Sequence, residues 1–554
     1  MSQHSDTRRD ILRKTGAAVG SGVMIGAAGC LGDGDETAGG PGDPVEEISL
    51  IITTADYDPV RYEFGQLIAD RWRELGFEVD VNPTAWNQIA DRAMTQQNFD
   101  AFTLNWVGRP ELIDPDILCY NLHHSSRRGE GQRNHVNYDN PEYDAVAEAQ
   151  RETFDEEERQ QYVYECQRIV MEDQPRTPIA NPTEAMPYHA GQFDEVVTMI
   201  GEGLMSYWTA VDSVPADGVD TLRLGYPSDV NNLNPNDGSA THDQQTMRLI
   251  YDRLVRFSQD GLAEPSLATN IENIDETTVE VTIREGHEWH DGEPLTIDDV
   301  AFSFEYIDQH SPVLSSVTDP IEDIEVVGEH TIQFNLEEPF APFNSVALGL
   351  VFIIPEHIWE NVPEEIDGVS EPVEWNNPEP VGSGPFEFVE WRRDEEMTLR
   401  ANHDHFDAPN IDTLIKVPGA DMGGLVRQLE AEAIDMIGSV PAPDSVRRLE
   451  EDVDHVEIST SESHSWYHIN YQLDRAPFDK KEIRQSLADA IPKQQIVDVI
   501  FDGLAEVTHT PIAEVNDFWH NPDVPEFGGN MERARQRLED EGYTGIGDQL
   551  QYPE

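Results

Sequence analysis

Basic residues and cysteines are both scarce in this chain of 554 residues. Lys and Arg together number 36 against 109 Asp and Glu, which gives a formal net charge of −73. Such acidity argues against nucleic-acid binding, because the phosphates would be repelled. The three cysteines, Cys30, Cys119 and Cys166, provide no disulfide framework for a chain of this length. We expect Cys119 and Cys166 to be two unrelated buried thiols rather than a bridge.

Long hydrophobic runs are also missing after the first thirty residues, so we expect no membrane-spanning segment there. Hydrophobic residues nevertheless make up 38% of the chain, which counts against disorder. The carboxylates are spread through otherwise ordinary globular segments. High salt would screen their mutual repulsion, so the composition predicts a halophilic, haloarchaeal source.

The first 45 residues have the pattern of an export signal followed by a tether. Arg8 and Arg9 precede a short run rich in Gly and Ala that ends at Cys30, which resembles a twin-arginine signal (residues 1–30) with a lipidation site. An ordinary secretory peptide with an incidental cysteine is the alternative. Residues 31–45 form an acidic, disordered tether. We therefore expect a soluble protein anchored by lipid at the extracellular face of the cytoplasmic membrane.

Residues 46–185 alternate between strand and helix patterns. Strands are predicted at 48–54, 77–81 and 99–106, and helices at 60–75 and 86–96. This alternation predicts a parallel α/β layer, in which ligands gather at the carboxyl ends of the strands. The segments 106–109 and 114–116 lie at such an end.

The segment Leu222–Pro235 has the pattern of an N-terminal strand and loop, although it follows a polar linker at 213–220. Beyond it we predict a helix at 246–257, strands at 279–284 and 331–335, and a helix that begins after Thr296. The acidic first turn of that last helix suits the positive end of the helix dipole.

Several short motifs together resemble family 5 of the extracellular solute-binding proteins, the dipeptide and oligopeptide-type receptors of ABC importers. Phe99–Asp100, Trp106, Asp114–Pro–Asp116, Asn140–Pro–Glu–Tyr–Asp144 and Pro175 are similar to the C-terminal part of that family. The string Trp289–His–Asp–Gly–Glu–Pro–Leu–Thr296, with Pro380–Val–Gly–Ser–Gly–Pro–Phe386, Asn402–Phe406 and Tyr467–Tyr471, is similar to earlier parts. The resemblance implies an α/β, periplasmic-binding-protein-like (class II) fold of two lobes with an extra domain.

The order of these parts is reversed relative to the usual family arrangement, so the sequence predicts a circular permutation. Chain ends normally lie in surface loops, so packing tolerates such a change. A fusion remnant that closes no complete fold is the alternative. The expected parts are the second lobe (46–185), a return to the first lobe with the linker (186–219), the first lobe (220–255), the extra domain (256–380), the first lobe continued (381–455) and the second lobe completed (456–554).

Six residues are candidate ligand contacts: Trp106, Arg109, Asp114, Tyr467, Asn470 and Ser383. The resemblance implies that an Asp after the Trp-x-Gly motif pairs with the α-ammonium of a peptide, but Arg109 stands there and favours an anionic group. Peptide specificity therefore requires Glu111 or Asp114 to take over that role. The sequence around His287 and His290 is expected to be a structural turn, and we predict no metal site, no cofactor and no catalytic residue.

These features predict a non-enzymatic, monomeric receptor. It captures a peptide-like or other small polar solute and delivers that solute to ABC permease subunits. Two alternatives remain open. One is a secreted hydrolase, because twin-arginine export also carries enzymes. The other is a structural envelope lipoprotein.

Overall fold

The computed structural model describes residues 40–109, 112–237, 241–311, 315–362, 366 and 368–554. The predicted export and lipidation residues Arg8, Arg9 and Cys30 lie outside these ranges, as does Glu111. Among the helices in these ranges, none combines the length and the hydropathy that a membrane crossing requires. Strands and helices alternate through most of the described chain, which makes the fold mixed α/β.

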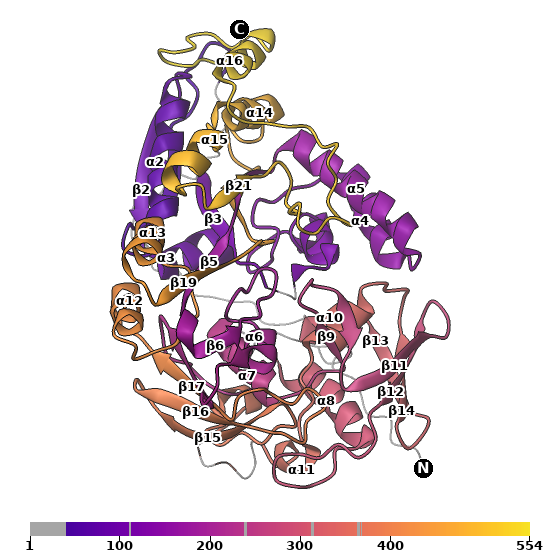
Figure 1. Ribbon diagram of the computed structural model, residues 1–554. Helices are drawn as coiled ribbons and strands as arrows, with labels where there is room; N and C mark the ends of the chain where they lie inside the picture. Colours follow the sequence, from indigo (N-terminus) through magenta and orange to yellow (C-terminus); the bar gives the residue numbers. More distant parts are fainter. Residues whose placement is uncertain (1–39, 110–111, 238–240, 312–314, 363–365, 367) are drawn as a thin grey trace, which may run out of the picture. The chain divides into compact units, whose positions relative to one another are not determined.

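Sheet A contains six strands and joins segments that are far apart in the sequence (Figure 1). Its order is β2 (Val79–Thr84), β1 (Ile48–Thr53), β3 (Ala101–Trp106), β20 (Trp466–Tyr471), β4 (Arg176–Pro182) and β21 (Ala505–Val507). β1 runs parallel to β2 and β3, as predicted. β20 lies antiparallel between β3 and β4, so the complete sheet is mixed rather than parallel.

Helices cover both faces of sheet A. α2 (Pro59–Arg73), α14 (Lys481–Ala490) and α16 (Met531–Asp540) pack on one face, whereas α4 (Pro141–Glu152) and α5 (Glu156–Asp173) belong to the core on the other. α2 begins where Asp58 accepts a hydrogen bond from the Arg61 amide and Pro59 occupies the first turn.

Cys119 and Cys166 are free and buried, so the expected absence of a bridge is confirmed for this pair. They are not unrelated, however. A hydrogen bond between the two thiols, together with burial, raises the pKa of Cys119 well above its usual value. Both belong to the core cluster under α4 and α5.

Sheet B contains seven strands. Its order is β15 (Phe386–Arg392), β16 (Glu396–Ala401), β17 (Thr413–Pro418), β8 (Thr221–Tyr226), β18 (Met436–Ile437), β5 (Glu184–His189) and β19 (Val456–Ser461). β8 runs parallel to β17 and β18 and buries Leu222 and Leu224 in one core with α6 (Tyr207–Asp212) and α7 (Thr241–Ile250). α12 (Met422–Glu430) and α13 (Pro443–Asp452) contribute to a smaller core beside β18 and β19.

The predicted helix at 246–257 is wrong in its second half. α7 ends at Ile250, and Val255–Phe257 forms strand β9, which pairs antiparallel with β10 (Ala263–Pro265). Alternating buried residues at 255 and 257 fit a strand period of two, which a short apolar run cannot distinguish from a helix.

A four-stranded antiparallel sheet lies between α7 and β15 in the sequence. Its order is β11 (Ala268–Asn273), β12 (Thr278–Ile283), β14 (Thr331–Leu336) and β13 (Ile321–Val326). It shares a core with α8 (Ile297–His310) and α10 (Phe343–Leu350). Thr296 and Asp299 form a capping box at the start of α8, as expected from the sequence. The predicted turn is confirmed by the hydrogen bond from the Trp289 amide to the Glu293 carbonyl, with Gly292 at a φ of 90°.

The chain passes between sheets A and B at two places, from β4 to β5 and from β19 to β20. Near the two ends of the described chain, the Val45 amide donates to the Leu550 carbonyl at 2.8 Å and the Tyr552 amide donates to the Asp43 carbonyl at 2.9 Å. The two end segments are therefore neighbours.

Candidate functional site

The two crossings between sheets A and B are tied to each other. Asn181 Nδ2 donates to the Ser465 carbonyl at 2.7 Å, and Ser463 Oγ donates to Glu184 Oε1 at 3.0 Å. Beside them lies a cavity of about 230 Å³. Its lining is Asn181, Pro182, Thr183, Glu462, Ser463, Glu506, Ala513, Glu514 and Val515. We call this the crossing cavity.

The crossing cavity is polar and acidic, because Glu462, Glu506 and Glu514 all line it. Burial raises the pKa of the adjoining Glu184 to about 7, although Ser463 donates a hydrogen bond to it. Its volume lies below the range of about 300–1,000 Å³ that is typical of small-molecule pockets, so it suits part of a solute or a small polar one. Perturbed carboxyl groups beside a cavity are typical of binding sites.

A third segment, Met199–Gly203, packs against the second crossing. The Gly201 amide donates to the Glu462 carbonyl at 3.0 Å. A Cβ at Gly201, whose φ is 77°, would lie 2.3 Å from Cε1 of His464, so no side chain fits there. His464 Nε2 in turn lies 2.7 Å from the Arg109 carbonyl oxygen. The loop after β3 is therefore held against the crossing and the 199–203 segment.

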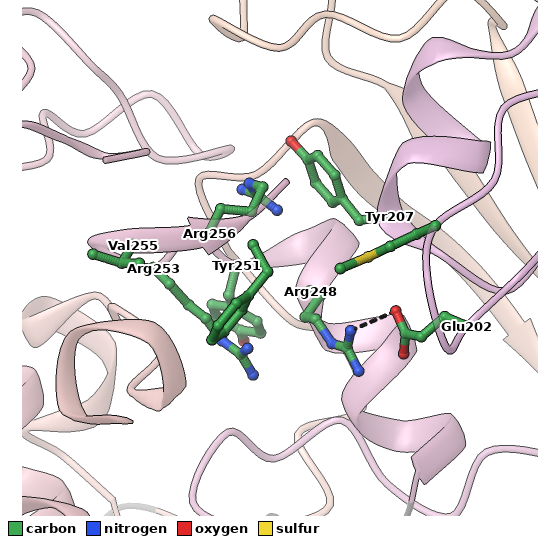
Figure 2. Close-up of a pocket in the computed structure, with 9 residues that line it drawn as sticks. Glu202, Tyr207, Arg248, Tyr251, Arg253, Val255 and Arg256 are labelled. Carbon is green, nitrogen blue, oxygen red and sulfur yellow. Dashed lines mark hydrogen bonds and ion pairs between the residues drawn. The ribbon is translucent and has the colours of Figure 1, made fainter. Parts of the chain in front are cut away.

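Figure 2 shows the small cavity behind that segment, where the Glu202 and Arg248 side chains face each other. Their ion pair measures 2.9 Å, with the glutamate 1% and the arginine 8% exposed. Gln245 Nε2 donates to the same carboxylate at 3.3 Å. The cavity is only about 20 Å³, which is enough for one water molecule. We therefore assign this ion pair to positioning the 199–203 segment rather than to holding a solute.

A buried lysine lies on β17, an interior strand of sheet B, near the end of β8. Lys416 contacts Thr246 Oγ1 and lies 4.1 Å from the centre of the Tyr226 ring. Burial lowers the pKa of Lys416 to about 7 and the pKa of the nearby His242 to about 4. Sequence reasoning missed this group, and the one signal for it was a lysine inside the apolar run of β17.

Three of the predicted ligand contacts lie on neighbouring strands of sheet A. Trp106 is half-buried and packs against two core clusters, and its Nε1 is buried with no hydrogen-bond partner among the described residues. Tyr467 packs against the core under α2, whereas Asn470 accepts a hydrogen bond from Arg176 Nε at 2.8 Å on the opposite face of β20. Tyr467 and Asn470 therefore cannot face the same space.

The other three predicted contacts lie outside these two strands. Arg109 follows β3, and its Nε is buried without a partner among the described residues. Asp114 is 8% exposed and pairs with Arg159 at 2.7 Å. Ser383 is fully buried and donates to Asp252 Oδ2 at 2.9 Å, in the part of the fold around α7.

Two groups of His and carboxylate side chains in the described ranges bring their ligand atoms within 4.8 Å of one another: Asp252, His287 and His405, and His189, Glu432 and His455. His405 Nδ1 accepts the Asp407 amide at 2.9 Å, so its Nε2 carries the proton and donates to Asp252. His189 Nδ1 likewise accepts from the Gly191 amide. A protonated ring nitrogen offers no lone pair to a metal, so the group around Asp252 is a hydrogen-bonded cluster. In the second group, His189 Nε2 lies 3.6 Å from Glu432 Oε2 and has no hydrogen-bond partner among the described residues.

The chain is similar to known binding proteins over much of its length. The family described as bacterial extracellular solute-binding proteins, family 5 Middle, matches residues 263–552. The oligopeptide-binding protein AppA of Bacillus subtilis is 30% identical over 338 residues, which cover 59% of this chain and 60% of AppA. The dipeptide-binding protein of Escherichia coli is 25% identical over 327 residues, covering 55% of this chain and 59% of that protein. The chain thus spans about 60% of the length of these relatives.

The solved structure of AppA from Bacillus subtilis in complex with a nonapeptide gives a TM-score of 0.48 at 27% identity, over 58% of this chain and 64% of that one.

Proposed function

The chain belongs to family 5 of the extracellular solute-binding proteins, and we propose that it is the solute receptor of an ABC importer. In this role it captures a peptide-like or other small polar solute and delivers it to the permease subunits in the membrane. The observation that carries the proposal is the family match over residues 263–552. Membership in a family of binding proteins agrees with the expectation that the chain is not an enzyme.

The crossing cavity supports this function. It lies where the chain passes twice between sheets A and B, and two crossings of this kind form a hinge in proteins that close over a solute. Hinge closure around the solute would produce the signal that the permease recognises. The acidic lining suits an ammonium group, which every free peptide carries.

The test uses the purified chain in high-salt buffer. We expect one solute to co-purify or to bind at one site, to raise the melting temperature and to be recovered unchanged, as detected by mass spectrometry. Binding only to the folded state at a hundred times Kd would add about 2.7 kcal/mol of stability. Turnover of the bound solute would favour a secreted hydrolase instead, and no melting shift with any solute would favour a structural lipoprotein.

We also propose that the order of the chain is a circular permutation of the family arrangement. Its support is that strands β1–β3, from the first part of the sequence, share sheet A with β20 and β21, from the last part. β8 lies in sheet B, where only β18 separates it from β5, the strand that comes before the linker in the sequence. The domain boundaries expected from the sequence are part of the same proposal.

A rearranged chain tests the permutation. Residues 220–554 followed directly by residues 46–215 should give the same circular dichroism spectrum and bind the same solute as the natural order, because the two end segments are already neighbours. A rearranged chain that stays unfolded would contradict the proposal.

Export by the twin-arginine route, lipidation of Cys30 and a haloarchaeal source complete the proposal. The formal charge of −73 supports a saline environment. Mass spectrometry of the membrane-bound form should detect a lipid-modified Cys30, and a C30S variant should be released from the membrane.

A further inference from the structure

Three arginines in the part of the chain after β3 form no ion pair with any described acid, and the charge of Asp319 acts on Arg127 only at longer range. Arg109, Arg127 and Arg133 form no ion pair and donate no side-chain hydrogen bond there, whereas the adjacent Arg128 pairs with both Asp139 and Asp474. The chain has 109 acidic and 36 basic residues, so acids are plentiful and an arginine that forms no ion pair is unexpected.

The backbone brings these arginines together. The Asn134 amide donates to the Arg127 carbonyl at 3.0 Å, which places Arg127 beside Arg133 across a short loop. Arg127 also lies over the ring of Tyr120, 5.4 Å from its centre, which restricts the guanidinium. The Nε atoms of Arg109 and Arg127 are both buried, and neither has a hydrogen-bond partner in the described part of the chain. We call Arg109, Arg127 and Arg133 the arginine cluster.

Electrostatics agrees with this proximity. Burial lowers the pKa of the Arg133 guanidinium, and the positive charges of Arg109 and Arg127 lower it further, although the Arg133 side chain keeps a solvent-exposed face. Like charges held together raise the free energy of the empty site, and a bound anion would remove this repulsion.

We propose that the arginine cluster binds an anionic group, a carboxylate or a phosphate, of the solute. The planar guanidinium donates two parallel hydrogen bonds to such groups, which makes arginine suited to this role. The inference rests on the proposed receptor function, because it assigns part of the solute to this cluster. The Arg109 carbonyl contacts His464, next to Ser463 of the crossing cavity, so the cluster and the acidic cavity are joined through one loop.

Arg109 and the acidic cavity together fit a solute with charges of both signs. A free peptide has this property, since an ammonium and a carboxylate terminate its two ends. The family resemblance alone implied recognition of the peptide's ammonium group. The arginine cluster would bind the carboxylate at the other end of the peptide.

The experiment is native mass spectrometry of the full chain at fixed KCl concentration. The probes are a mixture of tripeptides with free carboxyl termini, the same tripeptides as C-terminal amides, and inorganic phosphate. The wild-type chain is expected to retain free-acid tripeptides, or phosphate if that is the recognised group, and to lose the amides. The variant R109Q/R127Q/R133Q should weaken retention by about tenfold or more, since each bond to a charged group contributes more than a neutral one.

R535Q is the matched control, because Arg535 is exposed and no contact of its side chain is part of the cluster. Circular dichroism verifies that both variants fold. Equal retention of acids and amides, or unchanged retention by the triple variant, overturns the arginine cluster as an anion site and leaves the receptor function standing. A co-purified neutral or purely cationic solute overturns it as well. If no probe binds and no solute co-purifies, both the cluster and the receptor function fail.

Discussion

Replacing Asp114 by Asn should destabilise the fold without acting on a solute directly. Asp114 Oδ1 lies 2.7 Å from Arg159 Nη2, and its Oδ2 accepts from Ser345 Oγ at 2.7 Å. Both members of the ion pair are 8% exposed. Burial alone would raise the pKa of the Asp114 carboxyl, but Arg159 outweighs burial and holds that pKa below its usual value.

The magnitude follows from the charge that is left behind. D114N preserves the side-chain volume but leaves Arg159 buried without its anion, and breaking a buried pair in this way costs about 3–5 kcal/mol. Because the amide oxygen still accepts one hydrogen bond, we expect a loss of about 3 kcal/mol. D139N is the matched control: Asp139 is 53% exposed in its pair with Arg128, so its loss should stay below about 1 kcal/mol.

The assay is urea denaturation at constant KCl, with D114N, R159M and D114N/R159M compared in a double-mutant cycle. The double variant should be more stable than the sum of the two single losses predicts, because it leaves no unpaired buried charge. A D114N chain within about 0.5 kcal/mol of the wild type would refute the reasoning. Unchanged stability with lost solute binding would instead return Asp114 to its predicted role as a ligand contact.

Three further predictions concern buried positions elsewhere in sheet B, beside the crossing cavity and next to α7. Burial lowers the pKa of Lys416 from 10.5 to about 7. Between these pH values the unfolded chain holds a proton that the folded chain lacks, so the free energy of unfolding rises with pH. K416M should remove this slope and stabilise the chain most at the acidic end, and an equal gain at pH 6 and pH 10 would contradict the prediction. Burial raises the pKa of Glu184 from 4.5 to about 7, so the stability contributed by this group falls as the pH rises between these two values. E184Q should remove this loss of stability, which urea midpoints at pH 5 and pH 8 would measure. A Cβ at Gly382 would lie 1.9 Å from the Ile250 carbonyl oxygen, so G382A should cost about 1–3 kcal/mol; G328A, where the nearest atom is 3.4 Å away, is the control and should cost far less.

Elements with a local cause could be predicted from the sequence. α8 begins after Thr296 because Thr296 and Asp299 satisfy each other's backbone groups within four residues. The parallel strands β1 to β3 follow from alternation within some sixty residues. The helix predicted at 246–257 failed after Ile250, because the partner that makes Val255–Phe257 a strand is β10, which the apolar pattern of 246–257 does not include.

The candidate contacts divide in the same way. Trp106 and Arg109 became candidates because they lie at the end of a predicted strand and just after it. Asp114 and Ser383 were chosen from motifs, but their partners, Arg159 and Asp252, lie 45 and 131 residues away in the sequence. The arginine cluster was missed apart from Arg109, since only the folded loop brings Arg127 and Arg133 together.

The sequence by itself determined the acidic surface, the family resemblance and the type of most regular elements, because composition, motif order and periodicity are local properties. Tertiary structure alone decided that β20 separates β3 from β4, that the two end segments are hydrogen-bonded, and that the Arg109 carbonyl contacts His464 next to the crossing cavity. These depend on residues hundreds of positions apart, and the free energy that selects them comes from burial and pairing that exist only once the sheets have formed.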